Sequence, residues 1–257
     1  MGFKQSAHEV AVYRRGSGRN VLLVGVYVDD LIITGAEEQK VEVFKTQMKK
    51  AFDMSDLGLL CFYLGVEVRQ DASGIALRQT HYVKCILEFG DMTGCNLAHT
   101  PMEEKLKLSR ESTAEEVDPT HYRRLIGSLR YLVHSRTDIA FTVGYMSRFM
   151  ERSTMEHLQA IKRILRYMAG TLDYGLHYGR APDTARFVDY CDSDLAGDVD
   201  TSKSTTGTMF FLGDCLVNWQ SLKQKVVALS SCEAEYIATT TTANTCAVAV
   251  KDDGRAF

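Results

Sequence analysis

The sequence predicts an α+β fold, because strand-like and helix-like patterns alternate in its first hundred residues and then separate. Apolar, β-branched runs at residues 10–15, 24–33, 60–68 and 75–77 predict strands, with a hairpin turn inside the second run. Residues 41–48 and 82–87 carry apolar side chains at helical spacing, and Gly90 is placed to end the second of these helices.

The rest of the chain is predicted to pass from a loop to helices and back to strands. Thr100–Val117 is polar and lacks periodicity, so it predicts a linker or long loop. Three amphipathic helices follow at residues 122–132, 139–149 and 158–168, the third with a Ser153–Glu156 capping box and a stop at Gly170. Strands are predicted at 186–192, 208–212 and 215–219, and a helix near Ser230, where Ser230 and Glu233 fit a second capping box.

Composition bounds the class of protein and its compartment. The 257 residues suffice for one large domain or two modest ones, and 45% hydrophobic with 25% charged residues is typical of a soluble globular chain. No apolar run is long enough to span a membrane, and no secretory signal is visible. Seven cysteines without a Cys-x-x-Cys spacing predict free thiols. We therefore expect an intracellular protein of a reducing compartment, cytoplasm or nucleus, with no membrane partner.

Two adjacent acids, Asp29 and Asp30, are placed at the tip of the predicted hairpin, between Val24–Val28 and Leu31–Ile33. Like charges side by side repel, so the fold gains nothing from them on a tight turn. Divalent cations would neutralise the pair, and such a site supports phosphoryl transfer. A solvated Asp-Asp turn is the structural alternative.

Two more acids, nearer the end of the chain, are candidate metal ligands. Asp192 ends a predicted strand, and Glu235 lies one turn into the helix that follows. Glu233 has a capping role available, whereas Glu235 has none. An acid on a strand that faces an acid on a following helix can bind a divalent metal, although surface charges fit the spacing equally.

The three central helices carry an excess of positive charge. From His121 to Gly170 there are nine Arg and Lys residues and three acids, on a chain whose total charge is −3. A nucleic-acid backbone surface and an ordinary solvated helix face both explain this excess. The candidate contacts are Arg123, Arg124, Arg130, Lys162, Arg163 and Arg166.

Several strings resemble the Pol polyproteins of copia-type retrotransposons, in the family's order, from residue 2 to about residue 245. The reverse transcriptase strings are Tyr27–Asp30, Asp56–Gly58, Tyr63–Glu67, Thr100–Met102, Gly127–Leu132, Arg136–Ala140 and Lys162–Tyr167; the ribonuclease H strings are Asp192–Asp198, Lys203–Gly207 and Ala228–Tyr236. The resemblance implies a partial polymerase palm at residues 1–100, a linker and helical thumb or connection at 101–180, and a truncated ribonuclease H-like α/β domain at 181–257.

The same resemblance implies the chemistry. Asp29 and Asp30 match the polymerase metal ligands, and Asp192 and Glu235 match the first two acids of ribonuclease H. Each site would use Mg²⁺ ions on an RNA–DNA hybrid or DNA duplex. The family's third polymerase aspartate lies on an earlier strand, and only 28 residues precede Asp29. In the family, ribonuclease H uses a further aspartate on a later strand. The spacing of Asp252 and Asp253 does not support either of them in that role.

We therefore expect a fragment of an RNA-dependent DNA polymerase with ribonuclease H that is catalytically incomplete. Two alternatives stay open. One is a residual nucleic-acid-binding protein without catalysis. The other is a part that becomes active when another chain, or another part of the Pol polyprotein, supplies the missing groups.

Overall fold

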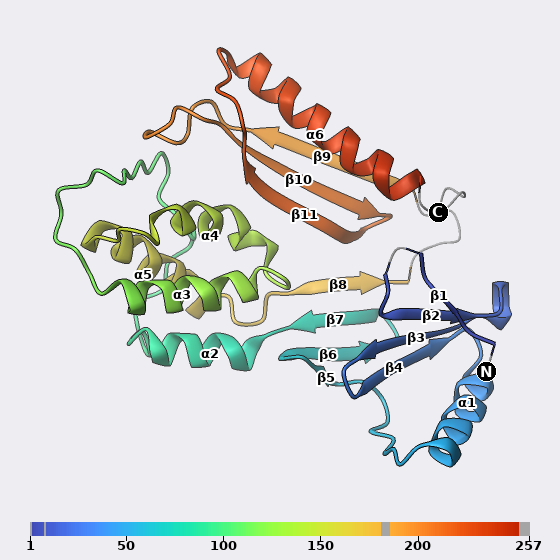
Figure 1. Ribbon diagram of the computed structural model, residues 1–257. Coiled ribbons are helices and arrows are strands. Elements are labelled where there is room, and N and C mark those ends of the chain that lie inside the picture. The colour runs from blue at the N-terminus through green and yellow to red at the C-terminus, as the bar shows by residue number, and fades with distance from the viewer. Residues whose placement is uncertain (1, 8, 181–185, 252–257) are drawn as a thin grey trace. The chain divides into compact units, whose positions relative to one another are not determined.

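The structure is a computed structural model that describes residues 2–7, 9–180 and 186–251. Within these ranges, helices and three antiparallel sheets form an α+β architecture, as the sequence predicts (Figure 1). The chain divides into two compact units, one built mainly from residues 1–60 and the other from residues 61–248. Each unit is described by itself.

The first unit is a four-stranded sheet with one helix. Its strands, in the order β1-β2-β3-β4, are β1 (Lys4–Gln5), β2 (Val12–Arg15), β3 (Leu22–Tyr27) and β4 (Asp30–Gly35); a 3-10 turn spans Gly18–Asn20 and α1 spans Glu38–Ala51. Leu22 and Val24 lie two residues apart on β3, so they share a face, and both are buried in a cluster with Phe44 of α1. This core fixes the register of the β3–β4 hairpin and therefore which residues form its turn.

The second unit begins with a sheet built by two distant parts of the chain. The strands, in the order β5-β6-β7-β8, are β5 (Phe62–Tyr63), β6 (Val66–Asp71), β7 (Gly74–Arg78) and β8 (Leu176–Gly179). The prediction of one strand over residues 60–68 is wrong. Leu64 and Gly65 adopt left-handed backbone angles (φ 48° and 80°) and turn the chain between β5 and β6. The Tyr131 hydroxyl donates a hydrogen bond to the Leu64 carbonyl and covers Gly65.

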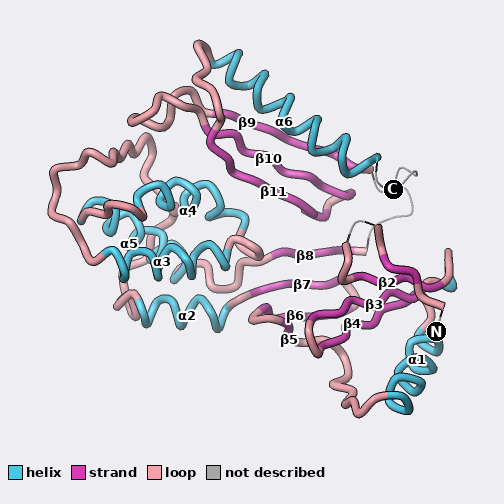
Figure 2. Tube along the Cα trace, viewed as in Figure 1, coloured by secondary structure: helices cyan, strands magenta, loops and turns pink. Residues whose placement is uncertain are grey.

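Helices form the largest core of the second unit. They are α2 (Thr80–Phe89), α3 (Pro119–Leu132), α4 (Ala140–Met146) and α5 (Met155–Ala169), with 3-10 turns at Thr137–Ile139 and Ser147–Phe149. The helix predicted at residues 139–149 is therefore shorter than expected. α4 ends at Met146, where the Ser147 hydroxyl donates to the Val143 carbonyl at 2.7 Å and a 3-10 turn follows. Residues 90–118 contain no helix or strand, which confirms the predicted loop (Figure 2).

The sequence predicts the last residue of α2 correctly and the first residue of α5 with a shift of one position. Gly90 ends α2, and a Cβ at this position would lie 2.7 Å from Leu165 Cδ1, so any larger residue there would force the Leu165 side chain of α5 to move. The predicted Ser153–Glu156 cap is shifted by one residue. Thr154 is the N-cap of α5, and its amide donates to Nδ1 of the buried His157 at 3.0 Å.

The last sheet has the order β11-β10-β9, with β9 (Phe187–Ser193), β10 (Thr205–Leu212) and β11 (Cys215–Lys223), followed by α6 (Ser231–Lys251). Figure 1 shows α6 lying along this sheet. The predicted cap is confirmed in its main part, since Glu233 N donates to Ser230 Oγ at 3.1 Å and Glu233 Oε2 accepts from Leu229 N at 2.8 Å. Asp252 and Asp253 lie outside the described residues.

Candidate functional site

The first acidic pair lies on the turn of the β3–β4 hairpin. Tyr27 pairs with Asp30 across the strands, so the turn itself consists of Val28 and Asp29, and Asp30 begins β4. Both acids and Tyr27 are exposed, and Val28 is 81% exposed with a left-handed φ of 51°. A β-branched residue rarely adopts this angle, and strain of this kind is concentrated at functional turns. The hairpin therefore presents its carboxylates to solvent at a strained turn.

The second acidic pair is brought together by one backbone amide. Ser193 N donates to Asp192 Oδ1 at 2.8 Å and lies 3.3 Å from Glu235 Oε1, so an oxygen of each carboxylate approaches the same nitrogen. Asp192 is exposed and Glu235 is half-buried. The strand acid and the helix acid that the sequence singled out are thus neighbours, 43 positions apart in the chain.

Gln224 holds the end of β9 to the start of α6, a role that the sequence did not indicate. Its side-chain amide donates to Ser193 Oγ at 3.1 Å and to the Ala234 carbonyl at 3.0 Å, and the residue is 6% exposed. Ser193 and Ala234 directly flank Asp192 and Glu235 in the chain. No local pattern marks such a glutamine, because its partners come from two other elements.

Asp194, the next acid in the chain, bonds to the backbone at the far end of the following loop and is not part of the Asp192–Glu235 pair. Its Oδ1 accepts from Thr205 N at 2.5 Å, and a Cβ on Gly197 would lie 1.9 Å from its Oδ2. The carboxylate is therefore held against backbone on both sides.

Asp198, in the middle of the same loop, connects the sheet to the helical part of the unit. The side chain is 7% exposed; Oδ2 pairs with Lys223 of β11 and with Arg148 NH1 at 3.4 Å, and Oδ1 accepts from the amides of Asp200 and Thr201. Burial raises the pKa of this carboxyl group, but Lys223 and Arg148 outweigh that effect and hold its pKa below the ordinary value. Arg148 NH2 also donates to Thr205 Oγ1 at 2.8 Å.

In the described part of the chain, no group of three or more His, Cys, Asp or Glu side chains could hold a metal ion. Each candidate site therefore offers two carboxylates, Asp29 with Asp30 and Asp192 with Glu235. Their all-oxygen donor set fits a hard cation such as Mg²⁺, which binds proteins through one or two carboxylates and completes its shell with water and substrate phosphates.

The six candidate nucleic-acid contacts differ in their exposure to solvent and in the contacts they make within the chain. Arg123, Arg124 and Arg130 on α3 and Lys162 on α5 are exposed. Arg123 Nε donates to the Met150 carbonyl at 2.9 Å, and the Arg124 guanidinium lies 4.0 Å from the centre of the Phe89 ring. Arg163 and Arg166 are half-buried, and Arg163 pairs with Glu103 at 3.1 Å.

Part of the excess positive charge that the sequence predicts for the helix surface is buried in the interior. Arg136 is 2% exposed; its guanidinium forms two hydrogen bonds to Asp138, at 2.9 and 2.7 Å, and donates to the Thr171 carbonyl at 3.0 Å. Tyr167 donates to the same Asp138 carboxylate at 2.8 Å, and burial with this hydrogen bond raises the pKa of Tyr167 to about 12. A structural arginine looks like a surface cation in sequence because its partners lie up to 35 residues away.

No helix in the described ranges combines the length and apolar content that crossing a membrane requires.

Known proteins resemble this chain over most of its length. Residues 1–104 match the reverse transcriptase (RNA-dependent DNA polymerase) family. The retrovirus-related Pol polyprotein from transposon RE1 of Arabidopsis thaliana is 38% identical over 92% of this chain. An uncharacterized mitochondrial protein of the same plant is 37% identical over 85% of this chain and 90% of its own length. A putative transposon Ty5-1 protein of Saccharomyces cerevisiae is 30% identical over 92% of this chain and 78% of its own length.

This chain therefore belongs to the reverse transcriptase family of retrovirus-related Pol polyproteins. It spans 16% of the length of the RE1 polyprotein. No solved structure matches it.

Proposed function

We propose that this chain is part of a copia-type retrotransposon polymerase followed by part of a ribonuclease H-like domain. Residues 1–100 would contribute to the polymerase palm, residues 101–180 would form a linker and the thumb or connection helices, and residues 181–257 would belong to ribonuclease H. The observation that carries this proposal is the exposed Asp29-Asp30 pair on the strained β3–β4 turn. The convergence of Asp192 and Glu235 on one amide supports its ribonuclease H part.

The roles of the acids follow from their donor chemistry. Divalent ions such as Mg²⁺, when bound, stabilise the attacking and leaving oxygens of an in-line phosphoryl displacement. Asp29 and Asp30 would hold them at the end of the growing DNA strand, and Asp192 with Glu235 beside the scissile RNA phosphate. Ser193 N–H orients both ribonuclease H carboxylates, and Gln224 fixes Ser193 against α6.

The isolated chain is expected to lack both activities. Each site in the family uses a further carboxylate that matches no described residue of this chain. Removing one group that stabilises transition-state charge costs roughly 10²–10³ in rate. Another part of the Pol polyprotein would have to supply that carboxylate.

A second function, nucleic-acid binding without catalysis, is favoured by one observation. Arg130 and Lys162 are exposed, and Arg123 and Arg124 keep their guanidinium groups on the surface of α3. Such cations bind phosphates and release counterions, which makes binding strongly salt-dependent.

One experiment tests both functions. The purified chain is mixed with an RNA–DNA hybrid and Mg²⁺, and binding and cleavage are measured from 50 to 200 mM salt. We expect binding that weakens with salt, without cleavage. A double variant of Arg130 and Lys162 to Gln should flatten the salt dependence by about two units of slope, at about 0.9 per lost phosphate contact. Arg152→Gln serves as the control, since Arg152 already pairs with Glu116 at 2.7 Å.

Two results would count against the proposal. Cleavage that disappears in Asp192→Asn would overturn the expected incompleteness, and undetectable binding at 50 mM salt would remove the nucleic-acid-binding function.

A further inference from the structure

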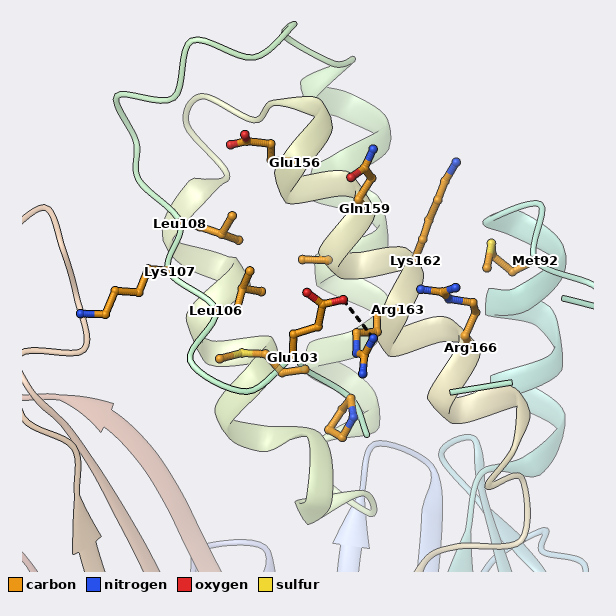
Figure 3. A pocket seen from close by; sticks show the side chains of 13 residues that line it. Met92, Glu103, Leu106, Lys107, Leu108, Glu156, Gln159, Lys162, Arg163 and Arg166 are labelled. Carbon is orange, nitrogen blue, oxygen red and sulfur yellow. Dashed lines mark hydrogen bonds and ion pairs between the residues drawn. The ribbon is translucent and has the colours of Figure 1, made fainter. Parts of the chain in front are cut away.

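A pocket of about 570 Å³ lies between α5 and the irregular segment of residues 101–108 (Figure 3). Its volume falls within the range of small-molecule sites, roughly 300–1,000 Å³. The segment is anchored near both ends: Arg163 NH2 donates to Thr100 Oγ1 at 2.9 Å, and Leu108 N donates to the Tyr145 hydroxyl at 3.0 Å. Arg163 belongs to α5 and Tyr145 to α4, so the two anchors hold the segment against these helices and leave the pocket between the segment and α5.

The pocket has an aliphatic floor. Its apolar lining residues are Met92, Pro101, Met102, Leu106, Leu108 and Ala160. None of the residues that line it, all of them described, is aromatic. Proteins that bind single-stranded nucleic acid stack its bases on aromatic rings, so this lining suits an aliphatic body better than a nucleobase.

Cations from α5 border this floor. Arg163 turns toward Glu103, whereas Arg166 lies beside Met92, and Lys162 extends from the same helix (Figure 3). No carboxylate of the described residues lies within ion-pair distance of Arg166 or Lys162, and the covered Nε of Arg166 has no hydrogen-bond partner there. The two charges are therefore uncompensated within the described part of the chain.

The other charged residues of the lining do not cancel this excess. Glu156 accepts a hydrogen bond from Ser112 Oγ at 2.8 Å, and Lys107 points away from α5 (Figure 3). Without Lys107, three cations and two anions line the pocket, and a net positive charge remains to favour an acid.

We propose that this pocket binds an amphipathic organic anion. Its acid group would contact Arg166 and Lys162, and its aliphatic body would lie over the methionine and leucine side chains. The charge-assisted contact supplies orientation, and the burial of the aliphatic body supplies most of the affinity. The site is distinct from both carboxylate pairs and does not depend on polymerase or ribonuclease H activity.

Methionine signals report directly on this pocket. The chain is labelled with ¹³C at its methionine methyl groups, and decanoate is titrated while the methyl signals are followed by NMR. We expect saturable shifts at Met92 and Met102, which line the pocket, and none at Met48 or Met209, which do not. Individual Met→Leu variants assign the signals.

Three variants complete the test. Arg166→Gln should weaken decanoate binding about tenfold, the effect of losing one contact to a charged group. Ala160→Trp should fill the pocket and abolish the shifts. Lys84→Gln removes an exposed cation of α2 outside the pocket and should change nothing.

The proposal fails if Met92 and Met102 do not shift in the wild-type chain, or if Arg166→Gln binds decanoate as tightly as wild type. It also fails if inorganic phosphate binds as tightly as decanoate, since the aliphatic body would then contribute nothing. Shifts of the same two signals by oligothymidylate at lower concentration than decanoate would make the pocket a nucleic-acid backbone site instead.

Discussion

Replacing Arg148 by Met is expected to destabilise the second unit through a buried charge. The Asp198 side chain is 7% exposed, and Arg148 and Lys223 are the two cations that contact it. Removing one partner of a buried ion pair costs about 3–5 kcal/mol. Lys223 and the amides of Asp200 and Thr201 remain in Arg148→Met, so we expect the lower end of that range, about 3 kcal/mol.

Arg152→Met is the matched control. Arg152 pairs with Glu116 at 2.7 Å, a shorter distance than the 3.4 Å between Arg148 and Asp198, but both side chains of the Arg152–Glu116 pair are exposed. Exposed pairs contribute little, so the same substitution should cost at most about 1 kcal/mol. Urea unfolding at pH 7 measures both free energies of unfolding. Equal losses in the two variants would refute the argument that burial of Asp198 decides the cost.

The pH dependence gives an independent reading of the same network. The pKa of Asp198 is lowered in the folded state, so its ion pairs stabilise the fold above the pKa of the unfolded chain, about 3.9, and lose that effect as the pH falls. The difference between wild type and Arg148→Met should therefore shrink below about pH 4. A difference that stays constant down to pH 3 would contradict this assignment.

Three further changes probe the helix ends and the hairpin. Gly90→Ala should cost about 2 kcal/mol, because its Cβ would lie 2.7 Å from Leu165 Cδ1, and a loss below about 0.5 kcal/mol in urea unfolding would show that α5 yields easily. Val28→Gly should stabilise the first unit by about 0.5–1 kcal/mol by relieving the left-handed φ of 51°, as measured by thermal unfolding; a lower midpoint would contradict the strain. Burial lowers the pKa of His157, so folding favours its neutral form, and the free energy of unfolding should fall as the pH drops below about 6.5. Unfolding midpoints of wild type and His157→Asn at pH 7.5 and 5.5 measure this loss. Equal pH dependence in the two chains would refute it.

Local patterns predicted the elements that carry the candidate sites. The β3–β4 hairpin follows from two apolar runs around Asp29-Asp30, and the end of α2 follows from Gly90. The break at Leu64-Gly65 escaped prediction, since the apolar residues on both sides of it continue the strand pattern. Its turn is held by Tyr131, a contact 67 residues away in the chain.

Side-chain partners across long separations explain the rest of what the sequence did not reveal. The resemblance identified Asp192 and Glu235, but nothing local marks Gln224 as the residue that joins their elements. In the same way, Arg148 belongs by sequence to a basic helical region, yet in the structure it pairs with Asp198, 50 residues later. Charge counts locate cations along the chain, and only the fold decides which of them face solvent.

Paramagnetic Mn²⁺, used in place of Mg²⁺, shows whether the Asp192 and Glu235 carboxylates bind divalent ions as proposed. Backbone amide signals of the isotopically labelled chain are recorded by NMR as Mn²⁺ is added. We expect Mn²⁺ to broaden the Ser193 amide signal selectively, since this amide lies 3.3 Å from Glu235 Oε1. The broadening should disappear in both Asp192→Asn and Glu235→Gln. Broadening of Ser193 that persists in Asp192→Asn, or no broadening there at millimolar Mn²⁺, would contradict it.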